Sequence, residues 1–253
     1  MLSDTGVATN ALTAAAVKAE LAMLADPADA VQLQRFFKTG PGDYGEGDVF
    51  LGVRVPQTRK VVKGFAGLPL SEIDVLLDSP VHEHRLAGLV ILNGAMAKAT
   101  RKRGGDETRQ REIVDLYLAA VKRGRVNNWD LVDASAEFVL GPWLFERPRD
   151  LLFEFAAGDS LWERRVALLT TFAFIKQGDT ATTLELCERL LPDRRDLIQK
   201  AVGWMLREIG KRVDAAILLG FLDAHAAAMG RTALSYATEH LTPEQRIHYR
   251  AQR

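Results

Sequence analysis

The chain has 253 residues, with 47% apolar and 26% charged side chains, which excludes wholesale disorder and is enough to bury a sizeable core. The 33 Lys and Arg residues balance 33 Asp and Glu residues, which argues against nucleic-acid binding over the whole surface but leaves a local basic face open. Cys187 is the only cysteine, so no internal disulfide can form, and neither a membrane span nor a signal peptide is indicated. We expect a cytoplasmic protein.

Helix patterns cover almost the whole chain. Five segments of the first half are Ala-rich or carry apolar residues at three- and four-residue spacing: 11–26, 55–65, 70–79, 82–100 and 108–124. Seven more follow, separated by short turns with Gly or Pro: 127–140, 148–157, 160–176, 180–191, 194–211, 213–228 and 242–252. Pro56 suits a first helical turn, and Ser71 is expected to cap the next helix. Only 48–55 resembles a strand, and we interpret it as an extended entry to the helix after Pro56. The chain is predicted to be all-α.

Distinctive helices recur along the second half. The segments WDLVD at 129, WERRVALL at 162 and GWMLRE at 203 begin helix pairs. Their separation of roughly 35 to 40 residues fits two-helix solenoid repeats, while an irregular helical bundle stays open. We expect a single domain over 1–253, with about 1–10 as a tail.

The segment 129–140 combines an aromatic residue and a carboxylate on one side. Its core stripe is formed by residues that meet on a helical wheel: Leu131, Val132, Ser135, Phe138 and Val139. Trp129 and Asp133 fall on the opposite side with Asp130 and Glu137, and Asn127 or Asn128 can cap the start. Because Asp133 lies beyond the first turn, capping does not explain it. A solvated acidic face and a functional site both remain open.

The segment 194–211 has the same arrangement with opposite charge. Its core side comprises Ile198, Ala201, Val202, Met205, Leu206 and Ile209. Trp204 lies off this side, flanked by Lys200 and Arg207, with Gly203 allowing close approach. The indole could stack on a sugar or base while the cations hold phosphates, or it could pack on a neighbouring repeat.

The segment 160–176 is apolar almost all round. A capping box of Ser160 and Glu163 begins it. Arg165, which follows Arg164, shares its side with Leu169 and Phe172, so its guanidinium needs a partner from elsewhere. That partner is either a carboxylate of the next repeat or a phosphate, which a guanidinium binds bidentately.

Two enzyme classes fit the sequence poorly. The five His are scattered, and His82 and His84 have no nearby cluster of metal ligands. No glycine-rich phosphate loop joins a strand to a helix. We therefore expect neither a metal nor another cofactor.

Together these segments resemble the DNA alkylation repair family of HEAT-like-repeat glycosylases, the AlkD type. The resemblance rests on WDLVD (129–133), LWERRVALL (161–169) and QKAVGWMLRE (199–208), with GDVFLGVRVPQTRKVVK (47–63) similar to the family's N-terminal signature. It covers about residues 30–240 and implies a HEAT-like solenoid with a concave DNA-binding face.

The resemblance also implies a site. The family's catalytic cluster falls on Trp129, Asp133, Arg165 and Trp204. DNA-backbone contacts are expected at Arg54, Arg59, Arg164, Lys200 and Arg207.

The implied substrate is an N3- or N7-alkylated purine in duplex DNA, such as 3-methyladenine or 7-methylguanine, released by a monomer without a base-flipping pocket. The cationic base leaves without a general acid, so one carboxylate, Asp133, would stabilise the oxocarbenium-like sugar and position water. Arg165 would hold the adjacent phosphate. Two alternatives stay open: a non-catalytic binder of branched or distorted DNA, and a protein–protein scaffold.

Overall fold

The computed structural model describes residues 12–252, so the expected tail at 1–10 lies outside it. These residues divide into two compact units, with the boundary between Arg101 and Lys102. The expectation of one domain stays a prediction. Throughout 12–252 the regular structure is helical, apart from one isolated bridge between Val49 and Val81, so the all-α prediction is confirmed. No helix in this range combines the length and the apolar character that crossing a bilayer requires.

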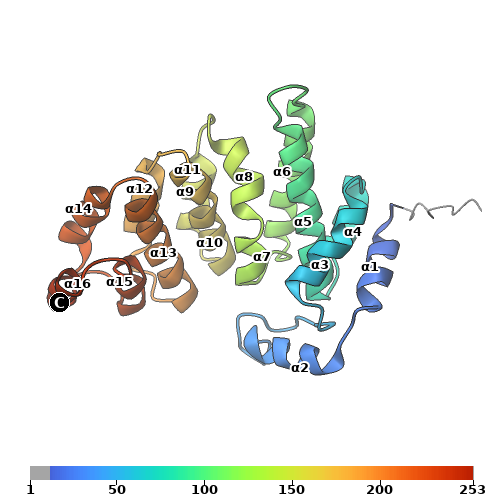
Figure 1. The fold of residues 1–253 in the computed structure, drawn as a ribbon, viewed down its shortest axis with the longest axis horizontal. Helices are drawn as coiled ribbons and strands as arrows, with labels where there is room; N and C mark the ends of the chain where they lie inside the picture. The colour runs from blue at the N-terminus through green and yellow to red at the C-terminus, as the bar shows by residue number, and fades with distance from the viewer. Residues whose placement is uncertain (1–11, 253) are drawn as a thin grey trace, which may run out of the picture. The chain divides into compact units, whose positions relative to one another are not determined.

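The first unit consists of short helices around α5 (Figure 1). In chain order they are α1 (Ala14–Ala22), α2 (Pro27–Phe36), α3 (Val55–Val62), the 3-10 helix η1 (Lys63–Phe65), α4 (Leu70–Leu77) and α5 (His82–Ala99). Helices α1, α3 and α4 all pack on α5. The expected cap at Ser71 is wrong, because α4 begins at Leu70 with Pro69 as its N-cap. Helix α2 was not predicted from the sequence.

The strand-like segment 48–55 leads into α3 without forming a strand, its backbone turns at Gly52 (φ 86°), and a buried carboxylate holds it. Glu83 of α5 accepts hydrogen bonds from the backbone amides of Leu51, Gly52 and Val53, at 3.0, 2.9 and 3.1 Å. These amides have no sheet partner, so the side chain replaces the missing strand. Helix α3 follows directly from this anchored segment.

The second unit contains the remaining helices. They are α6 (Glu107–Lys122), α7 (Trp129–Asp133), α8 (Ala136–Leu144), α9 (Asp150–Ala157), α10 (Leu161–Thr170), α11 (Phe172–Ile175), α12 (Ala181–Leu190), α13 (Asp196–Arg212), α14 (Ala215–His225), α15 (Arg231–Ala237) and α16 (Pro243–Ala251).

Three consecutive helix pairs organise the middle of this unit: α9 with α10, α12 with α13, and α14 next to α15 in the chain. The second helices of these pairs lie side by side, because α13 packs on both α10 and α15 (Figure 1). The first helices α9 and α12 also contact each other. Helices α7 and α8 extend the row by packing on α10.

Two predicted helices are broken in the structure. The segment 127–140 divides at Ser135, whose hydroxyl donates to the Leu131 carbonyl at 2.5 Å and whose backbone leaves helical geometry. As a result α8 is turned relative to α7, and Phe138 is 45% exposed instead of belonging to the core. Similarly, the segment 160–176 divides at Thr171 into α10 and α11, where the Thr171 hydroxyl donates to the Leu168 carbonyl at 2.7 Å. Helix α15 was missed altogether.

Candidate functional site

Helix α7 presents Trp129 and Asp133 at its first and last positions. It is only five residues long and depends on its cap, where the Asn128 side chain accepts a hydrogen bond from the Trp129 amide at 2.9 Å. Leu131 and Val132 are fully buried and point α7 into the core. Trp129 and Asp133, four residues apart, are therefore on the other side, and both are only partly buried.

Asp133 is held by Arg165 of α10. Arg165 Nε donates to Asp133 Oδ1 at 2.9 Å, and Nη2 donates to Oδ2 at 2.8 Å. The third nitrogen, Nη1, donates to the Leu197 carbonyl in the first turn of α13 at 2.6 Å. Arg165 thus joins three helices that lie far apart in the sequence, and its planar fork fixes the orientation of the carboxylate.

The two partners differ in access to solvent. The Arg165 side chain is 5% exposed, whereas the Asp133 side chain keeps 18% of its surface exposed. Each carboxylate oxygen has two lone pairs and uses one of them to accept a hydrogen bond from Arg165. Asp133 therefore retains acceptor capacity for a ligand or a water molecule.

Burial and Arg165 change the pKa of Asp133 in opposite directions. Desolvation raises the pKa of the Asp133 carboxyl above its ordinary value. The negative charge of Asp130 raises the pKa further, by a smaller amount. Charge and hydrogen bonds from Arg165 oppose this and lower the pKa. Arg165 therefore offsets part of the effect of burial and favours the charged form of the carboxylate.

The junction behind Asp133 is polar and buried. Tyr117 of α6 lies within 3.0 Å of the Ser135 hydroxyl, and both residues are inaccessible to solvent. Burial raises the pKa of the Tyr117 phenol, so this group stays neutral. The contact ties the break between α7 and α8 to α6.

Trp204 lies further along the same row of helices. Its indole contacts the Phe172 ring, with the two ring centroids 5.8 Å apart. Phe172 is seven residues beyond Arg165, and Trp204 is seven residues beyond Leu197. Seven helical residues rise about 10 Å, so Trp204 is anchored roughly two turns along α13 from the carbonyl that Arg165 contacts.

The predicted role of Gly203 needs correction. A Cβ atom at this position would lie 2.4 Å from the Ala233 carbonyl oxygen and 2.5 Å from Tyr236 Cβ. The close approach that Gly203 allows is therefore that of α15, and not of a ligand beside Trp204. The predicted core side of α13 is confirmed, because its six members are completely buried: Ile198, Ala201, Val202, Met205, Leu206 and Ile209.

The predicted backbone-binding cations of the second unit all have acidic neighbours. Arg164 pairs with Asp193 at 2.7 Å, Lys200 with Asp196 at 2.8 Å, and Arg207 with Glu239 and Glu208. Lys200 remains the most exposed of the three side chains. Their roles in DNA binding stay predictions.

Arg54 and Arg59 belong to the first unit. Arg54 is the N-cap of α3 and Arg59 lies within the helix, and both are exposed. Arg54 donates two hydrogen bonds to Asp29, at 2.8 and 2.7 Å. These interactions are at the surface, where an ion pair contributes little to stability and can exchange for another anion.

Neither the Leu197 carbonyl nor Phe172 as a partner of Trp204 was predicted from the sequence. A carbonyl has no sequence signal, whereas the shared seven-residue offset could have suggested the Phe172 contact. Within residues 12–252, His, Cys, Asp and Glu side chains form no cluster of three or more that could hold a metal ion.

The geometry defines a class: an all-helical protein in which a desolvated, anchored carboxylate lies on the same face of a short helix as an indole. The sequence profile described as "DNA alkylation repair enzyme" matches residues 17–241. The chain therefore belongs to the DNA alkylation repair enzyme family, and DNA is the partner that this family implies.

Comparisons with individual proteins add the fold. A solved structure, a predicted DNA alkylation repair enzyme from Enterococcus faecalis, is similar with a TM-score of 0.68 and 19% identity. The similarity covers 87% of this chain and 97% of that one, and at this identity it supports the fold alone. No curated protein matches the sequence significantly.

Proposed function

We propose that the chain is a DNA glycosylase that hydrolyses the N-glycosidic bond of N3- or N7-alkylated purines in duplex DNA. The observation that carries this proposal is the Asp133 carboxylate, held bidentately by Arg165 and still 18% exposed. A carboxylate sealed within an ion pair could not act on a ligand. This one is fixed in orientation and accessible at the same time.

The chemistry needs one negative group. Alkylation makes the base cationic, so it departs without protonation and leaves an oxocarbenium-like sugar. At about 4 Å and an effective dielectric constant near 20, a carboxylate attracts such a cation by about 4 kcal/mol. That energy corresponds to roughly a thousandfold in rate. The free lone pairs of Asp133 would also orient the attacking water.

Arg165 acts through Asp133 in this proposal. Three of its donors are already bound to Asp133 and Leu197, and it is almost completely buried. Its main role is to orient the carboxylate and keep it ionised. A contact between its remaining donors and a DNA phosphate stays a prediction.

The packing of the second unit supports a HEAT-like helical solenoid. Helices α10, α13 and α15 follow one another in a row, as the equivalent helices of stacked pairs do. We propose that this row carries the DNA-binding face, with Trp129 and Trp204 lining the deoxyribose. Recognition then depends on the charge and weak stacking of the lesion, without a base-flipping pocket, in a monomer that needs no cofactor.

A non-catalytic DNA binder is the second candidate. The observation that favours it is that both Asp133 oxygens accept hydrogen bonds from Arg165, as they would in a purely structural ion pair.

One experiment separates the two candidates. The protein is incubated with a duplex that contains 7-methylguanine, and the supernatant is analysed for free bases by chromatography. Release of 7-methylguanine well above the rate of spontaneous depurination is the expected result. Binding to the duplex without release would support the second candidate.

A further inference from the structure

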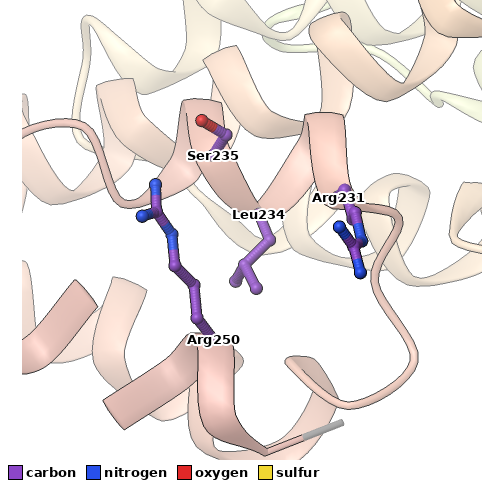
Figure 2. A pocket seen from close by; sticks show the side chains of 4 residues that line it. All are labelled: Arg231, Leu234, Ser235 and Arg250. Carbon is purple, nitrogen blue, oxygen red and sulfur yellow. The ribbon is translucent and has the colours of Figure 1, made fainter. Parts of the chain in front are cut away.

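Two arginines line a hollow at the C-terminal end of the second unit. It has a volume of about 420 Å³ and is lined by Arg231, Leu234 and Ser235 of α15 and by Arg250 of α16. Figure 2 shows Leu234 between the two arginines, with Arg250 extending from α16 toward Ser235. The lining thus combines two guanidinium groups with one hydroxyl, and it includes no carboxylate.

These two arginines differ from several other arginines of the unit. Arg149, Arg164, Arg165 and Arg207 all form ion pairs with Asp or Glu. Within the described residues, neither Arg231 nor Arg250 has an acidic partner or a hydrogen bond to a protein group. The Ser235 hydroxyl is also without a protein partner in this part of the chain.

The carboxylate that follows α15 most closely in the sequence is already paired with another arginine. Glu239, four residues after Ser235, is ion-paired with Arg207 of α13. Positive charge in the hollow is therefore not compensated by the helix that forms its wall. The two planar guanidinium groups and the hydroxyl supply several N–H and O–H donors, which suit the oxygens of a phosphate group.

We propose that this hollow binds a phosphate group through Arg231, Arg250 and Ser235. The phosphate belongs either to a nucleic-acid backbone or to a free phosphate ion. The site is separate from Asp133 and does not depend on glycosylase activity, so either proposal can fail without the other.

The test compares the wild type with an Arg231→Gln/Arg250→Gln double variant. Arg246→Gln and Arg189→Gln combined form the control, because they remove the same charge outside the hollow. In the first arm, inorganic phosphate is titrated by calorimetry at low ionic strength. We expect the double variant to bind at least about tenfold more weakly, as loss of charge-assisted hydrogen bonds predicts.

The second arm measures affinity for duplex DNA across a range of salt concentrations by fluorescence anisotropy. A backbone phosphate in the hollow predicts that the slope of log K against log salt decreases in magnitude by about 1 in the double variant. A change in both arms, or in the DNA arm alone, assigns the hollow to the backbone. A change in the phosphate arm alone assigns it to the free ion. The proposal is overturned if the double variant equals the control in both arms. Circular dichroism confirms folding, which these exposed positions should not affect.

Discussion

Arg165 binds Asp133, 32 residues away in the sequence, through two parallel hydrogen bonds. Two nitrogens on one edge of the guanidinium donate to the two carboxylate oxygens, at 2.9 and 2.8 Å. The pair joins α7 to α10, and the Leu197 carbonyl extends the connection to α13. The same contact that orients the carboxylate therefore also connects three successive parts of the second unit.

Replacement of Asp133 by Asn should abolish the release of 7-methylguanine while DNA binding largely survives. The amide keeps the shape of the carboxylate but loses the charge that stabilises the sugar cation. Single-turnover base release and anisotropy with the same duplex measure the two effects. Glu185→Gln is the matched control, because Glu185 is an exposed carboxylate that pairs with Arg189 of its own helix. Equal rates for Asp133→Asn and the wild type would refute the mechanism.

Replacement of Arg165 by Met should destabilise the second unit by about 3 kcal/mol, because it leaves a mostly buried carboxylate without its partner. The double variant Asp133→Asn/Arg165→Met should be less destabilised than the sum of the single variants, with a coupling of about 2 kcal/mol. Urea denaturation followed by tryptophan fluorescence reports on this unit specifically, since all four Trp residues belong to it. Additive effects would mean that the pair contributes nothing as a pair.

Base release should decline on acidification at a pH above the ordinary range of Asp. The reaction needs the charged carboxylate, and burial raises the pKa of Asp133, so protonation removes the charge as the pH falls through that raised value. Rates corrected for spontaneous depurination, measured from about pH 8 to pH 4, would show the decline. An acid limb that is absent, or that persists unchanged in Asp133→Asn, would assign the dependence to another group.

Replacement of Gly203 by Ala should cost about 1 to 3 kcal/mol, because the new Cβ atom overlaps the Ala233 carbonyl and forces α13 and α15 apart. Gly220→Ala in α14 is the matched control. A Cβ atom there meets nothing within 4 Å, and Ala is the better helix former by about 0.5 to 1 kcal/mol. The midpoints of urea denaturation should therefore shift in opposite directions.

Much of the helical framework could be predicted because it depends on apolar spacing. The core side of α13 follows directly from residues at three- and four-residue intervals, and its six members are completely buried. Helix α2 was missed because it has no buried residue and so no apolar stripe, although Asp26 and Pro27 form a recognisable start.

Long-range partners were harder to predict. The sequence indicated that Arg165 needs a partner but left a carboxylate and a phosphate open, and the fold supplies Asp133 from α7. The break at Ser135 was also missed, because a hydroxyl that bonds to the preceding turn is compatible with either a continuous or a divided helix. Arg231 and Arg250 could not be predicted as neighbours, since only the folded chain brings them to one hollow.

The break at Ser135 separates the helix that carries Trp129 and Asp133 from the helix that packs as part of the framework. Helix α8 is part of the structural framework, whereas α7 is a short element delimited by Asn128 at one end and by the Ser135–Tyr117 contact at the other. Substitutions at either boundary can re-aim the tryptophan and the carboxylate together, with no need to rebuild the scaffold.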